Sequence, residues 1–569
     1  MAVFGIDLGT TYSVIATLDE NKQPKIIENQ DEGKATLASA VYFPEDGGDP
    51  VVGTEAKGIA EAEPDRVARF IKRYIGKSNA EEIAHRDGLK ALFEYNGNTE
   101  SPITISSYIL KRLVEYAFQQ GYDVKDVVIT CPAYFTDEER RATRQAGENI
   151  GLNVLNIINE PTAAALSYCY NGYKENKKIL VYDLGGGTFD VTIVDLRVDD
   201  EQNVMVDAIR TGGNDKLGGV DWDNRLYDYL ASDYAEQNGI DINDLDAEII
   251  QIIHQKVEPT KISLSNVTSK TVTVVCEGES TKIAITREKF EELTKDLVDQ
   301  TMYFVDDVLN KASLSSDNIS EVLLVGGSTL MPVIMDTVKE KFPNSKVVRT
   351  DPHLAVAKGA AIFAGINVSE QYDEKPQNTG KSGEIGIGDG HEIPDSSSNR
   401  ENSIIQVRDP LSHSYGPSVY VTLEDGSEAF MIDNIAFIGE DVPVKNEKTY
   451  VAVGTSLEVD FYSNDSEVRE GNEQYVQPTY DASGNEQWTE PSLNVRHMGK
   501  AVLSNPDICP GDNVTVTIMV TNKGSKASIR HDKTGEVREC EFVSDTTQSE
   551  EETQANIERF KALRTRSDM

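Results

Sequence analysis

The sequence has few cysteines and a shortage of basic residues. Its 569 residues include five cysteines, which are far apart and form no CxxC or Cys/His spacing, so neither a disulfide framework nor a zinc site is indicated. Lysine and arginine number 55 against 96 acidic residues, which gives a formal net charge of −41. Because such a field repels polyanions, we expect no nucleic-acid partner.

Long apolar segments are also missing. The stretch Leu354–Ile366 is short and contains Lys358, whereas a membrane-spanning helix needs about 20 apolar residues. The N-terminal sequence MAVFGIDLGTTYS has no basic segment followed by an apolar core of the kind that directs export. The sequence therefore predicts no membrane partner and a cytoplasmic location.

Differences in composition divide the chain into four segments. Residues 1–368 alternate β-branched runs with helical patterns, which is typical of α/β proteins. Residues 369–402 are rich in Gly, Ser, Asp, Glu and Asn, which predicts a disordered acidic linker. Residues 403–545 contain short alternating strands separated by turn signals, which predicts a β-sandwich-like domain. Residues 546–569 are charged and predict only a short helix or tail.

The first segment contains an internal repeat. Residues 5–14 read GIDLGTTYSV and residues 182–191 read YDLGGGTFDV, so Asp-Leu-Gly followed by small residues and an aromatic occurs twice. The offset from Asp7 to Asp183 is 176 residues, about half of the segment. Two similar lobes, each opening with a β-hairpin, explain this spacing.

The two hairpin tips predict a phosphate site. Tips made of glycine, threonine and serine leave backbone N–H groups free to point into one concavity, and glycine allows a ligand to approach closely. Asp7 and Asp183 precede the tips, where a carboxylate suits a hydrated Mg²⁺ that bridges phosphate oxygens. One such motif would more often be a plain tight turn, but two copies at lobe spacing favour a Mg–nucleotide held between the lobes. The Walker A pattern GxxxxGK[ST] is absent.

A third glycine pair follows an apolar strand in EVLLVGGSTLMP, residues 321–332, and this segment resembles the adenosine-binding part of the actin-like ATPase superfamily. Together with GIDLGTTYS, INEPTAAAL, DLGGGTFDV and LGGVDWDNR, it makes residues 1–366 similar to the 70-kDa heat-shock (DnaK-type) chaperone family. The resemblance implies a two-lobed actin-like ATPase domain with duplicated ribonuclease-H-like lobes. It also implies slow hydrolysis of ATP, with ATP or ADP and Mg²⁺ as cofactors.

The resemblance assigns roles to individual residues. It makes Lys72, Glu160, Asp183 and Thr188 the catalytic group, with Asp7 and Asp183 contacting the metal through water. The nucleotide-binding residues that it implies are Asp7, Gly9, Thr10, Thr11, Tyr12, Gly185, Gly186, Gly187, Glu258, Lys261, Ser265, Gly326, Gly327, Ser328 and Leu330. A lysine in this setting can hold the attacking water and offset the developing negative charge. Outside the motif, Lys72 would be interpreted as a surface lysine and Glu160 as an acid favoured by the helix dipole.

Four further residues bear on nucleotide binding or on its coupling to the second domain. Pro132 matches the family's switch proline, although a plain strand-ending proline is the rival interpretation. Ile262 and Leu330 stand where the family usually has arginines that sandwich the purine, and His353 stands where an aspartate is usual. Because apolar contact on both faces can hold a flat base, we expect ATP binding to survive with altered exchange.

The second half resembles the family's peptide-binding β-domain in residues 409–412, 431–445 and 529–537. An unfolded or extended polypeptide, a J-domain co-chaperone and a nucleotide-exchange factor are the partners that this resemblance implies. A structural or partner-binding β-domain is an equal alternative. The apolar linker is reduced to residues 404–407, Asn156 replaces a usual arginine, and the helical lid is reduced to a stub. We therefore expect reduced coupling between the domains and rapid loss of bound peptide.

Three functions follow from these features. The leading hypothesis is an ATP-driven chaperone for exposed apolar peptide segments. The alternative is a nucleotide-switched interaction protein whose β-domain holds one folded partner. A small-molecule kinase would share the ancestral core, but the sequence shows no acceptor motif for one.

Overall fold

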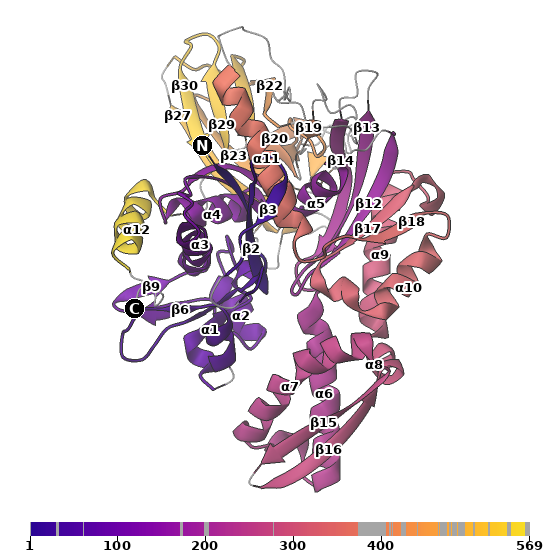
Figure 1. The fold of residues 1–569 in the computed structure, drawn as a ribbon. Coiled ribbons are helices and arrows are strands. Elements are labelled where there is room, and N and C mark those ends of the chain that lie inside the picture. Colours follow the sequence, from indigo (N-terminus) through magenta and orange to yellow (C-terminus); the bar gives the residue numbers. More distant parts are fainter. Residues whose placement is uncertain are drawn as a thin grey trace.

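Figure 1 shows the computed structural model of the chain, in which two lobes flank a central region and a β-rich unit packs against one of them. The structure describes residues 2–29, 33–60, 62–170, 175–198, 204–276, 278–373, 405–408, 411, 413–422, 428–440, 442–464, 466, 475–476, 479–480, 486–487, 495–504, 507–521, 524–542 and 548–563. Most of the predicted linker, residues 374–402, lies outside this set, as do residues 409, 410 and 412 of the motif that resembles the peptide-binding domain.

The first lobe, lobe I, is built on a sheet of order β11-β10-β1-β2-β3, with β4 paired to β2. β1 and β2 form an antiparallel hairpin, and β1, β10 and β11 run parallel. The strands are β1 (Val3–Asp7), β2 (Tyr12–Leu18), β3 (Pro24–Ile26), β4 (Leu37–Ala38), β10 (Asp126–Cys131) and β11 (Asn153–Asn159).

Lobe II repeats this arrangement. Its sheet has the order β18-β17-β12-β13-β14-β19, with a central antiparallel hairpin β12–β13 and parallel pairing of β12, β17 and β18. The order and direction of β14-β13-β12-β17-β18 match those of β3-β2-β1-β10-β11, which is the duplication that the sequence repeat predicts. The strands are β12 (Lys177–Leu184), β13 (Phe189–Val198), β14 (Val204–Asn214), β17 (Glu321–Val325), β18 (Lys346–Arg349) and β19 (Ile405–Arg408).

Two helices, α5 (Glu160–Cys169) and α11 (Ala355–Asp373), join the lobes at the base of the cleft. They cross closely, because a Cβ on Gly359 would lie 1.7 Å from the carbonyl oxygen of Ala163. Their buried residues share one apolar cluster with residues of β12, β13 and β17. α11 runs five residues into the segment 369–402 that the sequence assigns to the linker.

The remaining elements of the lobes form the walls of the cleft. In lobe I, α3 and α4 each begin with a capping box, which satisfies the free N–H groups of the first turn. Lobe II carries an arm in which α6 and α7 pack beside the β15–β16 hairpin (Figure 1).

The lobe I elements are β5 (Ala40–Tyr42), β6 (Val51–Val52), α1 (Thr54–Ile59), β7 (Val67–Arg69), α2 (Ala80–Arg86), β8 (Phe93–Tyr95), β9 (Asn98–Glu100), α3 (Pro102–Gln119) and α4 (Asp137–Glu148). Those of lobe II are α6 (Gly219–Asn238), α7 (Ala247–Asn266), β15 (Ser269–Cys276), β16 (Glu279–Thr286), α8 (Arg287–Leu293), α9 (Lys295–Lys311) and α10 (Pro332–Lys341). Short 3-10 helices span Pro64–Arg66, Ile71–Arg73, Ile242–Asp244, Ser316–Asn318 and Gly327–Leu330.

The β-rich unit contains two antiparallel sheets, of order β24-β21-β20-β23-β27 and β22-β28-β29-β30, besides the small pair β25–β26. Side chains from both sheets, including Phe461 and Ile518, meet in one buried apolar cluster. The strands are β20 (Ser414–Thr422), β21 (Glu428–Asp433), β22 (Val444–Val451), β23 (Ser456–Asn464), β24 (Tyr475–Val476), β25 (Thr479–Tyr480), β26 (Glu486–Gln487), β27 (Arg496–Ser504), β28 (Asn513–Thr521), β29 (Gly524–His531) and β30 (Val537–Glu541).

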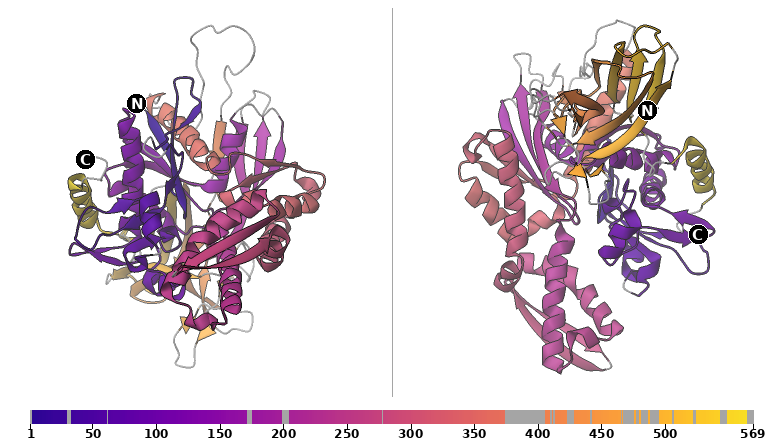
Figure 2. Two further views of the ribbon diagram at one scale, coloured as in Figure 1. Left: turned by 60° about the horizontal axis from the view of Figure 1, so that its bottom comes forward. Right: turned by 180° about the vertical axis from the view of Figure 1, so that it is seen from behind.

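The β-rich unit is attached to lobe I through α4. Ser525 donates a hydrogen bond to Asp137, and Arg141 donates to the carbonyl oxygen of Phe542. Gln145 and Gln548 exchange two hydrogen bonds of 2.8 and 3.0 Å. Seen from behind, the sheets lie directly against lobe I (Figure 2).

The strand β19 lies apart from the other strands that the sequence assigns to the segment 403–545. It pairs in parallel with β14 from Ile405 beside Val204 to Arg408 beside Asp207, and so extends the sheet of lobe II. The chain therefore contacts lobe II before it enters the β-rich unit that is held by lobe I.

The C-terminal helix α12 (Glu550–Ala562) lies against α3 and α4 of lobe I (Figure 1). Phe560 is 2% exposed, belongs to the core cluster of lobe I and packs edge-on against Tyr108 with a centroid distance of 4.8 Å. Arg559 donates two hydrogen bonds, of 2.8 and 3.1 Å, to the buried carboxylate of Glu100. Lys111 donates to the carbonyl oxygens of Phe560 and Leu563 at the end of the helix. The predicted stub is therefore part of the packing of lobe I.

Within the described residues, none of the helices combines the length and the apolar character that crossing a membrane requires.

Candidate functional site

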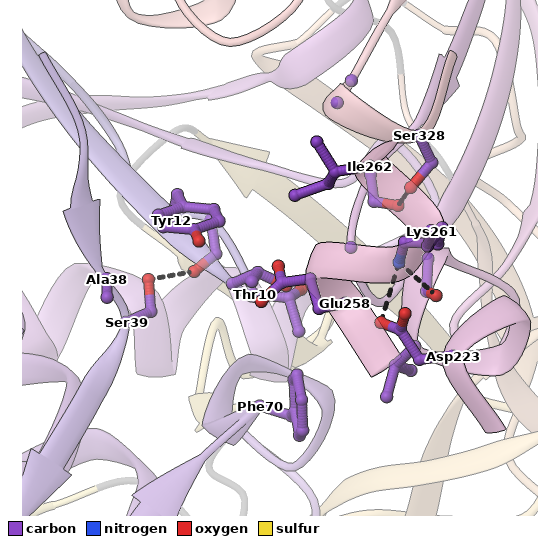
Figure 3. A pocket seen from close by; sticks show the side chains of 18 of the residues that line it. Thr10, Tyr12, Ala38, Ser39, Phe70, Asp223, Glu258, Lys261, Ile262 and Ser328 are labelled. Carbon is purple, nitrogen blue, oxygen red and sulfur yellow. Dashed lines mark hydrogen bonds and ion pairs between the residues drawn. The ribbon is translucent and has the colours of Figure 1, made fainter. Parts of the chain in front are cut away.

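A cavity of about 1820 Å³ lies between the two lobes. Its walls come from both hairpin tips, the turn around Phe70, the start of α5, the helix α7 and the Gly327–Leu330 turn. Figure 3 shows Tyr12 and Ser39 on one wall, with Lys261, Asp223 and Ser328 on the other. The predicted residues that line it are Asp7, Gly9, Thr10, Thr11, Tyr12, Lys72, Glu160, Asp183, Gly185, Gly186, Thr188, Glu258, Lys261, Ser265, Gly326, Gly327, Ser328 and Leu330. Gly187 is the one predicted residue outside this lining.

The two hairpin tips touch each other across the cleft. A Cβ on Gly186 would lie 1.9 Å from the hydroxyl oxygen of Thr11, so glycine is required where the lobes meet. The first tip is held by Ser39, which donates to the carbonyl oxygen of Gly9 over 2.8 Å. The second tip is held by Ser328, which donates to the carbonyl oxygen of Gly185 over 2.8 Å. Both tips are therefore fixed by side chains from other elements before any ligand binds.

The backbone conformation at Gly326, the first glycine of the third motif, also requires a glycine. Gly326 has φ of 83°, a left-handed conformation that side chains disfavour, and a Cβ there would lie 2.2 Å from the carbonyl oxygen of Leu184. This turn brings the end of β17 against the second hairpin. Residues 326–328 thereby become a wall of the same cavity.

Buried charges gather below the tips. Lys72 is 4% exposed and forms an ion pair with Glu160, which is itself buried at the first turn of α5. Asp7 accepts a hydrogen bond of 3.3 Å from Thr130, and Asp183 is 7% exposed. One lysine thus faces three carboxylates, which leaves the group with excess negative charge.

This excess shifts the proton affinities of the group. Burial raises the pKa of Asp7 to about 7, the charge of Glu160 adds to the rise, and Lys72 opposes it. The pKa of Asp183 is raised well above its usual range by burial, with further contributions from Glu160 and Asp7. Burial lowers the pKa of Lys72, but attraction by Glu160 and Asp7 outweighs this, so the pKa is raised and the lysine stays charged.

The buried charge group formed by Lys72, Glu160, Asp7 and Asp183 is suited to a divalent cation that is held through water. Among the described residues, no three His, Cys, Asp or Glu side chains are grouped closely enough to hold an ion directly. Asp7 and Asp183 both line the cavity and carry the repulsion that a nearby dication would relieve. Mg²⁺ keeps several waters and takes few protein carboxylates, so the donor set fits it.

The second hairpin is connected to the predicted switch proline. Asp190 is 1% exposed and accepts a hydrogen bond of 3.2 Å from the backbone N–H of Ala133, the residue after Pro132. Burial, followed by the charges of Glu160 and Asp183, raises the pKa of Asp190 well above its usual range. A change at the hairpin tip can therefore reach the loop at Pro132 through one hydrogen bond.

Sequence reasoning missed several residues that complete the cavity. Arg73 donates to the carbonyl oxygen of Gly187 over 2.9 Å and to Asp221 over 3.1 Å, and so joins the lobes. Lys57 donates to Glu258 over 2.6 Å and to the hydroxyl of Tyr12 over 3.0 Å. Asp221 lies in the motif LGGVDWDNR, which carried a signal, whereas Lys57 has no local motif that marks it.

The raised pKa of Asp7 gives a test on the unliganded protein. An acid with a higher pKa in the folded chain than its ordinary 3.8 binds more protons when folded, so stability falls as pH rises between the two values. We expect unfolding free energy to fall from about pH 4 to about pH 7, by at most about 1.4 kcal/mol per pH unit for this group. Denaturation curves at several pH values should show a weaker fall in Asp7→Asn. Asp123→Asn, at an exposed carboxylate, is the control, and an equal pH dependence in Asp7→Asn and the wild type would contradict the expectation.

The fold and the cavity define a two-lobed protein with a polar cavity between its lobes, and comparisons with known proteins place it in a family. The family model described as Hsp70 protein matches residues 3–376, and the chain belongs to the Hsp70 family. The resemblance identified in the sequence is thereby confirmed, and it implies the actin-like two-lobe fold. Proteins of this family are ATPases that bind ATP or ADP with Mg²⁺.

The curated relatives are chaperone proteins named DnaK. The chain is 40% identical over 376 residues to that of Thermosipho melanesiensis and 39% identical over 376 residues to that of Thermosipho africanus, which is 65% of this chain and 60% of each relative. With the protein of Thermotoga neapolitana the identity is 40% over 372 residues, or 64% of this chain and 59% of the relative. The matched part of the chain thus spans about 60% of the length of these relatives.

Proposed function

We propose that the chain is an ATP-dependent chaperone that binds exposed apolar peptide segments under the control of ATP hydrolysis. The observation that carries this proposal is the meeting of two hairpin tips above Lys72, Glu160, Asp7 and Asp183 in one cavity. Residues 1–368 would form the ATPase domain and residues 403–545 a peptide-binding β-sandwich. A cytoplasmic location, a J-domain co-chaperone and a nucleotide-exchange factor belong to the same proposal.

In the proposed mechanism, the hairpins bind the phosphates and the charge group directs water. Backbone N–H groups at Thr10, Thr11, Gly186 and Gly187 would face the β- and γ-phosphates, with Thr188 beside the γ-phosphate. The N–H groups of Gly9 and Gly185 instead hold the tips, because they donate to the hydroxyl of Ser13 and to the carbonyl oxygen of Thr188. Lys72, positioned by Glu160, orients a water whose oxygen attacks the γ-phosphorus while the bond to the β–γ bridging oxygen breaks. Bound Mg²⁺ would be held through water by Asp7 and Asp183 and would offset the phosphate charge.

The route from the nucleotide to the β-rich unit uses contacts already described. Loss of the γ-phosphate removes the ligand shared by the two tips, and the hydrogen bond from Ala133 to Asp190 conveys this change to Pro132. The chain from Pro132 leads directly into α4, which carries Asp137 and Arg141 at the contact with the β-rich unit. Asn156, whose side chain accepts a hydrogen bond of 2.8 Å from the N–H of Ile157, lies on the neighbouring strand β11.

Strand β21, which lies between β20 and the two-residue strand β24, is suited to an extended peptide along its outer side. Within the described residues, β24 pairs with β21 at Ile432 and Asp433 alone, so the outer backbone groups of residues 428–431 have no strand partner there. An extended peptide can add to such an edge through backbone hydrogen bonds and leave specificity to side-chain pockets. This feature supports peptide binding by the β-rich unit.

The test measures steady-state ATP hydrolysis by the full chain with and without a reduced, unfolded polypeptide. We expect faster hydrolysis with the unfolded polypeptide, because its binding shifts the β-rich unit and, through α4, the cleft. The same polypeptide in its folded state is the control and should have no effect. No acceleration by unfolded chains, together with tight binding of one native protein, would instead support the nucleotide-switched interaction protein.

A further inference from the structure

The cavity has a phosphate end and a base end. The hairpin tips and Lys72 define the phosphate end, while α7, the Gly327–Leu330 turn and the loop before α11 enclose the opposite end. At that end the side chains of Ile262 and Leu330 are 56% and 41% exposed, so both are available to contact a flat ring. The inference that follows rests on the proposed function, because it takes the ligand to be a nucleotide.

The side chain of Arg349 lines the base end and has N–H groups that are not used in hydrogen bonds within the protein. It stands at the last residue of β18, which pairs with β17 beside the glycine turn. One nitrogen, Nη2, donates to the carbonyl oxygen of Thr329 over 2.6 Å. Its Nε is buried and has no hydrogen-bond partner, although a guanidinium carries five N–H groups. Thr329 takes one N–H of Nη2, so the N–H groups of Nη1 and the second N–H of Nη2 remain for a ligand in the cavity.

The other polar groups at this end are already engaged or neutral. Lys57 pairs with Glu258, and Lys261 donates to Asp223 and to the carbonyl oxygen of Gly219. The ring of His353 packs against the glycine turn, because a Cβ on Gly327 would lie 2.4 Å from it. Burial lowers the pKa of His353, which keeps the ring uncharged at neutral pH. Arg349 is thus the cation at this end whose donors remain available.

We propose that Arg349 recognises the base, by donating hydrogen bonds to the acceptor edge of a purine held between Ile262 and Leu330. Guanine presents two adjacent acceptors, N7 and O6, on one edge, whereas adenine presents N7 beside an amino group that is itself a donor. A guanidinium cannot accept from that amino group. The cavity therefore binds guanine nucleotides at least as well as adenine nucleotides.

The test is calorimetry on the full chain with Mg²⁺ and three probes: ADP, GDP and inorganic pyrophosphate, which has no base. The wild type should bind GDP at least as tightly as ADP. Arg349→Met should weaken GDP by about tenfold or more, weaken ADP less, and leave pyrophosphate unchanged, because a bidentate contact to guanine is lost. Arg349→Lys, which keeps a donor, should recover part of the GDP affinity and also serves if the methionine variant fails to fold.

Lys346→Met is the matched control, since it removes a positive charge from the same strand at an exposed position outside the cavity lining. It should leave all three affinities unchanged. Weak GDP binding by the wild type, or an unchanged ratio of GDP to ADP affinity in Arg349→Met, would overturn the role of Arg349 while leaving the proposed function intact. Failure of the wild type to bind either nucleotide would overturn both.

Discussion

Replacing Lys72 with alanine is expected to lower the rate of ATP hydrolysis by about 100-fold or more, the usual cost of removing a transition-state donor. The ammonium group is 4% exposed, lines the cavity and is held by Glu160, so its position is fixed before the substrate arrives. Nucleotide affinity should change much less, because the hairpin tips and the residues of the base end are intact. Single-turnover hydrolysis and calorimetric binding of ADP, both with Mg²⁺, separate the two effects.

Lys90→Ala is the control for this variant. Lys90 also lies in lobe I but is 44% exposed and pairs with Asp65 outside the cavity lining. It should hydrolyse ATP at the wild-type rate. A Lys72→Ala protein that loses binding and turnover in equal measure would show that the lysine acts in binding alone, and an unchanged rate would remove it from the mechanism.

Replacing Phe560 with alanine is expected to reduce the unfolding free energy by about 3–5 kcal/mol, the range for truncating a buried phenylalanine. The ring is 2% exposed within the core cluster of lobe I and contacts Tyr108, although it stands only a few residues from the end of the chain. Denaturant unfolding of the full chain measures the effect. Loss of stability should be accompanied by release of α12, detectable as faster proteolysis after residue 548.

The neighbouring residues supply the controls for this second experiment. Lys561→Ala alters a side chain that is 63% exposed and should leave stability within about 0.5 kcal/mol of the wild type. Arg559→Met should destabilise the fold, because it leaves the carboxylate of Glu100, 1% exposed, without its cation. A Phe560→Ala protein as stable as the wild type would show that α12 is detached from lobe I in solution.

The sequence was sufficient for the features that local motifs encode. Two Asp-Leu-Gly turns, separated by about half of the first segment, predicted a duplicated fold, and the sheets of the two lobes have the same strand order. The same motifs, with the segment at Gly326, predicted residues that line a single cavity, apart from Gly187, whose carbonyl oxygen binds Arg73. Glycine-rich turns have local backbone requirements, which is why they can be recognised without the fold.

Contacts between distant segments could not be predicted in this way. The short apolar run at Ile405 indicates a strand, but nothing in it shows that β14 of lobe II is the partner. The last segment of the chain is mostly charged, and its single phenylalanine gives no sign of a place in the core of lobe I. The pair Lys57–Glu258 joins residues 201 positions apart, and the free donors of Arg349 follow from its position beside the glycine turn.

The β-rich unit is tied to both halves of the molecule: on its N-terminal side β19 is a strand of lobe II, and on its C-terminal side α12 is packed into lobe I. Any rotation of one lobe against the other must then be accommodated between β19 and the contacts of the β-rich unit with α4. The β-rich unit is therefore attached at both ends to different lobes, so opening or closing of the cleft would apply a shear force to its sheets.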